Sequence, residues 1–140
     1  MEQLEQRVET LIEEAPVCFI TYIDREGYPI AKAMLPPRER KGFREIWFST
    51  NTSSQKVRAF REDPKASVYF MDRSRFQGVS LAGTVEVLET PEAKERLWRE
   101  GDQLYYKRGV TDPDYCVLRF NAVKGRYYHN FQSEDFEVRD

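Results

Sequence analysis

One stretch, residues 45–56 (E-I-W-F-S-T-N-T-S-S-Q-K), constrains the fold most because its character changes over a short distance. It begins with Ile46, Trp47 and Phe48, which are large side chains that favour a β-strand. Hydroxyl and amide side chains follow, and a helix-like run then occupies residues 55–62. Such a junction leaves free backbone N–H groups at the helix start, beside hydroxyls that can also donate hydrogen bonds. The stretch therefore predicts a strand that turns directly into a helix.

Lys56 lies in the first turn of this predicted helix, where the helix dipole disfavours a cation. A bound anion would reverse that penalty. Ser54 and Lys56 at a helix N-terminus therefore predict a phosphate site. The residues alone equally allow an ordinary helix cap at Ser53 or Ser54 beside a solvated lysine.

Length and charge exclude several classes of protein. A chain of 140 residues with a formal net charge of -2 has no bulk attraction for nucleic acid or anionic membranes. Its N-terminus is acidic and amphipathic, unlike a signal peptide, and its apolar runs are too short to cross a bilayer. We therefore expect one domain over residues 1–140, located in the cytoplasm, with no nucleic-acid or membrane partner.

Metal and acid–base chemistry have little support in the sequence. Cys18 and Cys116 form no CxxC motif, and a cytosolic disulfide has a low prior. His129 is the single histidine, so neither a His-rich metal site nor a Ser-His-Asp triad is indicated. We expect no metal site, and we assign no catalytic residue.

Periodicity and turn residues predict the order of the elements. Helices are expected over residues 2–14, 55–62 and 91 to about 100. Strands are expected as a hairpin over 17–23 and 28–35, a long strand over 78–88, and a closing hairpin over 115–120 and 126–131. Residues 38–44 are expected to form a solvated loop, 121–125 a turn and 133–140 an acidic tail, while Gly83 marks a bulge or a close approach. This order predicts an α+β, mainly β, fold in which helices cover the openings of an antiparallel barrel.

Ordered blocks along most of the chain resemble the pyridoxamine 5'-phosphate oxidase-like FMN-binding split-barrel family, and within it the short general stress proteins. The blocks are residues 27–34 (G-Y-P-I-A-K-A-M), 47–51 (W-F-S-T-N) with Ser54 and Lys56, 63–70 (D-P-K-A-S-V-Y-F), 79–86 (V-S-L-A-G-T-V-E), and 109–114 (G-V-T-D-P-D) with 126–128 (R-Y-Y). No single block is specific, but their order is. The resemblance implies a six-stranded antiparallel split β-barrel with flanking helices.

The resemblance also implies FMN as the cofactor and a homodimer whose flavin sites lie at the interface. Carried across, it places Lys32, Ser54 and Lys56 at the FMN phosphate. It places Ser49, Thr50 and Asn51 along the ribityl chain or the ring edge. Ala33 and Met34 belong to the same implied site. Candidates for the contribution from the partner are Gln77, Tyr105, Tyr106 and Tyr128.

Two departures from the family pattern limit the implied activity. Lys32 stands where arginine is usual, which replaces a bidentate fork by a point charge. The acidic tail differs from the basic C-terminal segment that holds the substrate in vitamin-oxidising members, so we do not expect pyridoxamine phosphate oxidation. The implied function is an FMN-dependent oxidoreductase with an unknown small substrate. The alternatives are a flavin-binding or stress-related protein without turnover, and a split barrel that binds another cofactor.

Overall fold

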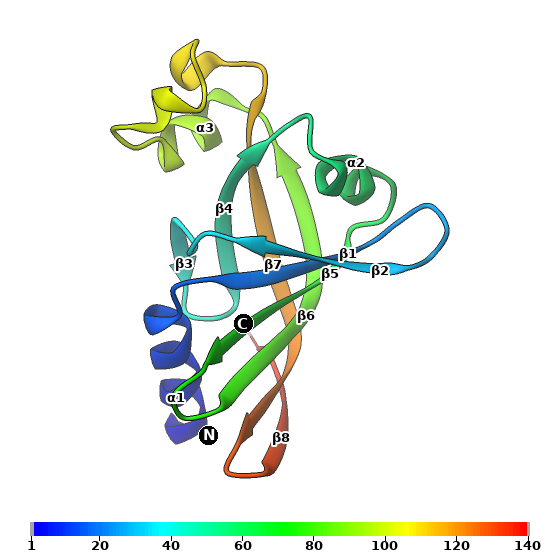
Figure 1. Ribbon diagram of the computed structural model, residues 1–140, viewed down its shortest axis with the longest axis vertical. Helices are drawn as coiled ribbons and strands as arrows, with labels where there is room; N and C mark the ends of the chain where they lie inside the picture. The colour runs from blue at the N-terminus through cyan, green and yellow to red at the C-terminus, as the bar shows by residue number, and fades with distance from the viewer. Residues whose placement is uncertain (1, 140) are drawn as a thin grey trace.

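The computed structural model describes residues 2–139, which form three α-helices, two short 3-10 helices and eight strands (Figure 1). The helices are α1 (Glu2–Glu14), α2 (Gln55–Glu62), α3 (Pro91–Leu97), η1 (Asp102–Leu104) and η2 (Gly109–Thr111). The strands are β1 (Cys18–Ile23), β2 (Pro29–Met34), β3 (Glu39–Lys41), β4 (Glu45–Asn51), β5 (Lys65–Asp72), β6 (Gln77–Leu88), β7 (Tyr115–His129) and β8 (Gln132–Glu137). None of the helices in this range is long and apolar enough to cross a membrane.

All strands in the described range join one antiparallel sheet in the order β2-β1-β5-β6-β7-β4-β3, and β8 pairs with β7. The sheet curves round, so that β1 and β2 cross the long strands β4 and β7 (Figure 1). It does not close, because β2 and β3 remain at its two ends. The predicted class, an α+β and mainly β split barrel, is confirmed, but the sheet has eight strands rather than the expected six, because β3 and β8 form in segments predicted to be irregular.

The main core fills the inside of this curved sheet. Alternation along the strands turns Ile20, Phe70 and Leu81 inward, where they are fully buried. Helix α1 adds Val8 and Leu11 at helical spacing, as the sequence predicted for residues 2–14. Burial of this apolar surface is the main force that holds the helices on the sheet.

Helix α2 packs on strands β1 and β6 through Val57 and Phe60. The Phe60 ring meets Tyr22 of β1 edge-to-face, with centroids 6.1 Å apart. The first turn of α2 therefore has a fixed place beside β1, and beside β2 next to it.

Strand β7 corrects the prediction of a turn at 121–125, because it runs unbroken from Tyr115 to His129. Gly125 is needed for packing instead: a Cβ there would lie 2.3 Å from the Phe136 ring. Gly83 is the predicted close approach, since the register shifts beside it and a Cβ would lie 1.9 Å from the Asn121 carbonyl oxygen. Gly83 of β6 and Gly125 of β7 thus admit close contacts without ending their strands.

The remaining corrections concern segments predicted to be irregular. The loop expected over 38–44 contains β3, which pairs with β4. The expected acidic tail contains β8, so the closing hairpin turns at Asn130 and Phe131, whose φ angles are 48° and 62°. Pairing with a neighbouring strand overrides the polar composition in both places. Helix α3 ends at Leu97 rather than near residue 100.

Candidate functional site

The N-terminus of α2 is capped by Ser54, as one of the two sequence interpretations expected. Its Oγ accepts a hydrogen bond from Val57 N at 3.4 Å. The hydroxyl proton of Ser54 is still available to donate, because the cap uses only an acceptor. The backbone N–H groups of Gln55 and Lys56 lie in the first turn, which has no intrahelical acceptors and no acidic side chain. The helix start therefore offers several donors and no negative charge of its own.

Asp114 shapes the loop that leads into α2. Its Oδ1 accepts a hydrogen bond from Ser53 N, and its carbonyl oxygen accepts one from Thr52 N, both at 2.8 Å. Hydrogen bonds from Ser53, and then from Asn51, hold the pKa of the Asp114 carboxyl below its ordinary value. Sequence reasoning did not single out this role. In the sequence, Asp114 is only a carboxylate just before a predicted strand. The residues that donate hydrogen bonds to it, Thr52 and Ser53, lie about 60 positions earlier in the chain.

Lys56 is a buried cation. Its side chain is only 7% exposed, and among residues 2–139 no carboxylate lies within 4 Å of its ammonium group. Burial lowers the pKa of Lys56, and the positive charge of Lys32 lowers it further. Desolvating a charge without a counter-ion is unfavourable, so this position carries an electrostatic cost that an anion would remove.

Lys32 comes from β2, the strand at one end of the sheet. It lies opposite Ile20 of β1, next to the strand on which α2 packs, and it is exposed. Lys32 also has no ion-pair partner among the described residues. The fold thus places Lys32 near enough for its charge to lower the pKa of Lys56, although the two lysines come from segments far apart in the chain. This arrangement is suited to a multiply charged anion.

The neighbours of Lys32 on β2 face different surroundings. Ala33 lies opposite Phe19 on the outer face, and Met34 is buried in the main core. Because β2 pairs only with β1 in the described chain, one row of its backbone N–H and C=O groups has no strand partner.

Ser49, Thr50 and Asn51 do not face one common space. Thr50 is buried, and alternation along β4 puts Ser49 on the opposite face. Ser49 Oγ is buried there without a hydrogen-bond partner. Asn51 is exposed, and its amide donates to Asp114 Oδ2 at 3.4 Å. The structure therefore brings together Lys32, Ser54 and Lys56, but not this second group.

Comparison with known proteins decides the family. The sequence profile of pyridoxamine 5'-phosphate oxidase matches residues 4–129. The chain belongs to this family. A solved structure from Clostridium acetobutylicum, of a protein related to general stress protein 26 of B. subtilis and of the pyridoxinephosphate oxidase family, is 34% identical. The alignment covers 99% of this chain and 96% of the Clostridium protein, with a TM-score of 0.89.

More distant structures share the fold of this oxidase family. General stress protein 26 from Bacillus anthracis is 17% identical, covers 97% of this chain and 99% of that chain, and has a TM-score of 0.76. A heme binding protein from Mycobacterium smegmatis is 18% identical, covers 95% of this chain and 57% of that chain, and has a TM-score of 0.75. At such identities the likeness concerns the fold alone. A search of curated proteins gives no significant match.

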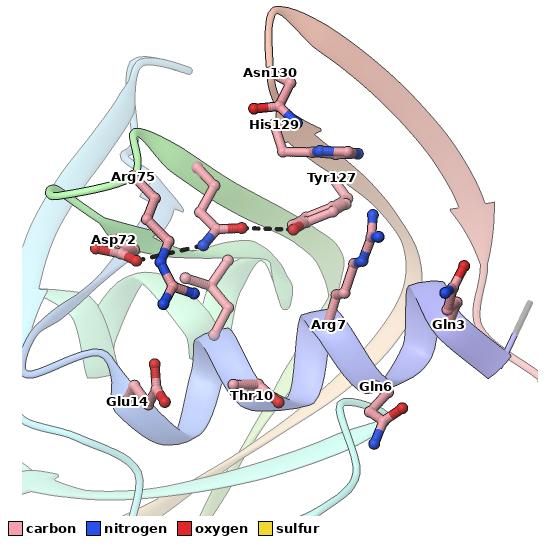
Figure 2. Close-up of a pocket in the computed structure, with 12 residues that line it drawn as sticks. Gln3, Gln6, Arg7, Thr10, Glu14, Asp72, Arg75, Tyr127, His129 and Asn130 are labelled. Atoms are coloured by element: carbon pink, nitrogen blue, oxygen red, sulfur yellow. Dashed lines mark hydrogen bonds between the residues drawn. The ribbon is translucent and has the colours of Figure 1, made fainter.

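Gln77, the residue that the family resemblance assigns to the partner, lies in a different part of the chain. It lines a groove between α1 and the ends of β6 and β7 (Figure 2). Lys32, Ser54 and Lys56 are not among the residues that line this groove. One chain alone therefore does not bring Gln77 to the two lysines. No group of three or more His, Cys, Asp or Glu side chains within residues 2–139 is arranged to hold a metal.

The two neighbouring tyrosines of the η1 segment have opposite environments. Tyr106 is buried in a second core, where its ring lies 4.9 Å from that of Tyr115, while Tyr105 is 77% exposed. Of this pair, only Tyr105 has its ring available for a ligand or a partner. Tyr128 is half-buried, and its ring meets Phe76 edge-to-face.

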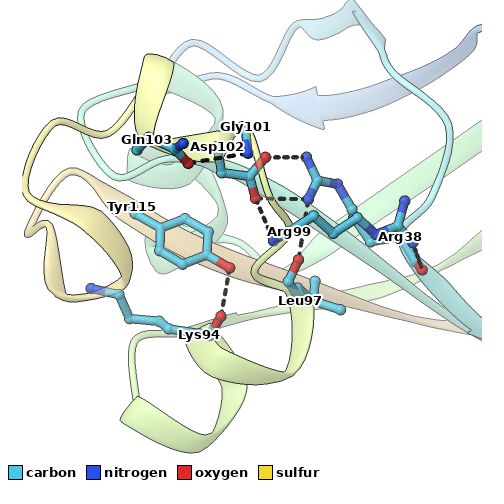
Figure 3. Close-up of polar contacts among 8 residues, drawn as sticks. All are labelled: Arg38, Lys94, Leu97, Arg99, Gly101, Asp102, Gln103 and Tyr115. Carbon is cyan, nitrogen blue, oxygen red and sulfur yellow. Dashed lines mark hydrogen bonds and ion pairs between the residues drawn. The ribbon is translucent and has the colours of Figure 1, made fainter.

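A buried ion pair ties η1 to the segment before β3 (Figure 3). The Arg38 guanidinium donates to both Asp102 oxygens, at 2.8 and 2.9 Å, and also to the Leu97 carbonyl oxygen. Asp102 Oδ2 accepts a further hydrogen bond from Arg99 N at 2.9 Å. The Arg38 guanidinium, and then the Arg99 amide, hold the pKa of Asp102 below its ordinary value against the effect of burial. This network fixes the second core over the outer face of β4, where Ser49 lies.

Proposed function

We propose that this chain is an FMN-binding flavoprotein whose phosphate site is the start of α2 together with Lys56 and Lys32. The observation that carries the proposal is Lys56, a buried cation without a counter-ion, beside a second unpaired lysine. Membership of the pyridoxamine 5'-phosphate oxidase family, whose barrels generally bind flavin, supports it.

The residues present fit a phosphate ester. A dianionic phosphate would supply the negative charge that both ammonium groups lack. Ser54 would donate its hydroxyl proton, and the amides of the first turn of α2 would donate along the helix axis. The unpaired backbone edge of β2 offers further groups that a ligand could satisfy.

The protein part of the mechanism is binding and orientation. When bound, FMN would supply the electron transfer, so the chain needs no acid–base residue of its own for that step. Lys32, Ser54 and Lys56 would fix the phosphate end, which leaves the ring end to the β2 edge and to the partner. We propose an oxidoreductase with a small substrate. Flavin binding without turnover is the alternative that the test below separates.

Absorbance and anaerobic reduction test this function. The freshly purified protein should show a flavin spectrum, and heat should release FMN. NADH or NADPH added without oxygen should bleach the flavin rapidly if the protein is an oxidoreductase. Slow bleaching with every physiological donor would favour flavin binding without turnover. A haem spectrum, or failure of the apoprotein to bind added FMN, would contradict the proposal.

We further propose a homodimer, because the outer face of β1, β2 and β5 is apolar and exposed. Phe19 and Tyr69 lie side by side across two strands of this face, 39% and 38% exposed, and Ala33 flanks Phe19. Val17 and Leu35 extend the patch. A second copy covering this face would bring new groups to the nearby β2 edge.

Light scattering should therefore give a particle of twice the chain mass. Replacement of Phe19 by glutamate should shift the particle toward the monomer and weaken FMN binding, because a charge would enter an apolar interface. Replacement of the exposed Leu104, which lies outside this patch, by glutamate is the matched control and should leave the dimer intact. A monomeric wild-type protein that still binds FMN would refute the interfacial site.

A further inference from the structure

We propose that the groove between α1 and the ends of β6 and β7 is a second ligand site, which binds a small carboxylate or phosphate through Arg7 and Arg75. The groove has a volume of about 730 Å³, within the range of small-molecule sites. It lies wholly within one chain and shares no lining residue with the lysine pair. The inference therefore does not depend on the phosphate site at Lys32 and Lys56.

The floor of the groove is held by a chain of hydrogen bonds. Tyr127 Oη donates to Gln77 Oε1 at 2.6 Å, and Gln77 Nε2 donates to Asp72 Oδ2 at 3.3 Å (Figure 2). These two bonds fix which end of the Gln77 amide is the donor and leave one of its two N–H groups unused. The wall beside them is flat, because the His129 ring stacks on Tyr127 with centroids 4.9 Å apart.

Two guanidinium groups face this floor from different elements. Arg7 comes from α1 and Arg75 from the turn between β5 and β6, and both side chains enter the groove (Figure 2). Burial raises the pKa of Tyr127, while the positive charges of Arg7 and Arg75 lower it, so both cations act on the same hydroxyl. Neither arginine has a hydrogen bond or an ion pair to a carboxylate among residues 2–139.

The carboxylates that line the groove, Asp72 and Glu14, form no ion pair with Arg7 or Arg75. Asp72 Oδ1 accepts hydrogen bonds from the Ser74 amide and hydroxyl, at 2.9 and 2.8 Å, and Oδ2 is taken by Gln77. Asp72 therefore builds the turn through neutral donors and keeps its negative charge beside Arg75. Glu14 is exposed and lies about two helical turns, roughly 10 Å, from Arg7 along α1. The part of the groove nearest Arg7 and His129 keeps a positive charge.

The chemistry of the ligand follows from these groups. A guanidinium fork pairs best with a group that presents two oxygens, which is a carboxylate or a phosphate. The flat His129–Tyr127 wall suits a small planar molecule that carries such a group. Benzoate is the simplest probe for a carboxylate ligand, and inorganic phosphate is the simplest probe for a phosphate ligand.

Nuclear magnetic resonance titrations of the full chain, carried out in the Lys56→Met background, test the site without competition from the lysine pair. At least one probe should cause saturable shifts at Arg7, Arg75, His129 and the Gln77 side chain. Tighter binding of benzoate would indicate a carboxylate ligand, and tighter binding of phosphate would indicate a phosphate ligand. The double variant Arg7→Gln/Arg75→Gln should weaken that binding at least tenfold, about 1.4 kcal/mol.

Arg73→Gln is the matched control, since Arg73 lies in the same exposed turn but does not line the groove. It should leave the affinity unchanged. Absence of saturable shifts with both probes, or equal losses in Arg73→Gln and the double variant, would overturn the inference. The Lys56→Met background also separates the two proposals, because the groove should bind its probe as well as in the wild type while FMN binding is weakened.

Discussion

Replacement of Lys56 by methionine should weaken FMN binding about 10- to 100-fold and leave the fold intact. A charge-assisted hydrogen bond contributes about 1.5–3 kcal/mol, which corresponds to that range of affinity. Methionine is chosen because the Lys56 side chain is almost fully buried, so its aliphatic stem packs against neighbours. Methionine keeps that packing and removes only the charge. Fluorescence quenching of free FMN on binding is a suitable measurement.

The stability of the same variant provides a second readout. Because burial lowers the pKa of Lys56, the folded protein holds the charged form less well than the unfolded chain does. The free energy of unfolding of the apoprotein should therefore be unchanged or higher in Lys56→Met. A protein that loses FMN and becomes more stable is difficult to explain by damage to the fold.

Lys32→Met and riboflavin complete the test. Riboflavin lacks the phosphate, so a lysine that binds the phosphate should matter for FMN and not for riboflavin. Lys65→Met is the matched control, because Lys65 is exposed at the start of β5 and lies outside the site. If Lys56→Met binds FMN as tightly as the wild type, the phosphate site is not at α2. Equal losses of affinity for FMN and riboflavin would instead show that the lysines do not bind the phosphate.

The sequence predicted the local part of this site but not its electrostatics. Ser54 as the cap and residues 55–62 as the helix follow from capping preference and hydrophobic spacing. The residues alone, however, equally allowed a solvated lysine, and only the family resemblance placed Lys32 with Lys56. The burial of Lys56 and the approach of Lys32 depend on how α2 packs on β1 and on the β1–β2 register. Both are tertiary facts with no signal in the local pattern.

The same distinction explains the errors in the strands. Asn121 and Gly125 are turn-forming residues by local preference, which led to a predicted turn inside β7. Gly125 instead admits the Phe136 ring, and Phe136 lies in a segment that its acidic neighbours marked as a tail. A glycine in a strand means either a break or a close contact, and only the partner across the sheet decides between them.

The second large effect is expected at Asp102, in the ion pair with Arg38 (Figure 3). Replacement of Asp102 by alanine should lower the free energy of unfolding by about 3 kcal/mol, because it leaves a partly buried guanidinium without its counter-ion. This value is at the low end for such pairs, since the Arg38 side chain keeps 21% of its exposure and can reach water. The urea midpoint should fall without a change in the m-value.

The pH dependence has a defined sign. Because folding lowers the pKa of Asp102, its contribution is complete above the ordinary aspartate pKa of about 3.9. The contribution is lost as the pH falls through the lower pKa of the folded state. Wild-type and Asp102→Ala stabilities should therefore converge only in strong acid. Convergence near neutral pH would mean that Asp102 acts through something other than its charge.

Two further variants separate the ion pair from its surroundings. Glu62→Ala removes the partner of Arg25 in an exposed pair, with side chains 49% and 74% accessible, and should leave the urea midpoint unchanged.

The double replacement Arg38→Met/Asp102→Leu removes both buried charges and should recover most of the stability lost in Asp102→Ala. If the double variant is stable but Tyr105 becomes mobile, the ion pair serves to position η1 over β4 rather than to stabilise the fold. If the double variant is as unstable as Asp102→Ala, the hydrogen bonds to Leu97 and Arg99 hold the segment, and the charges are secondary.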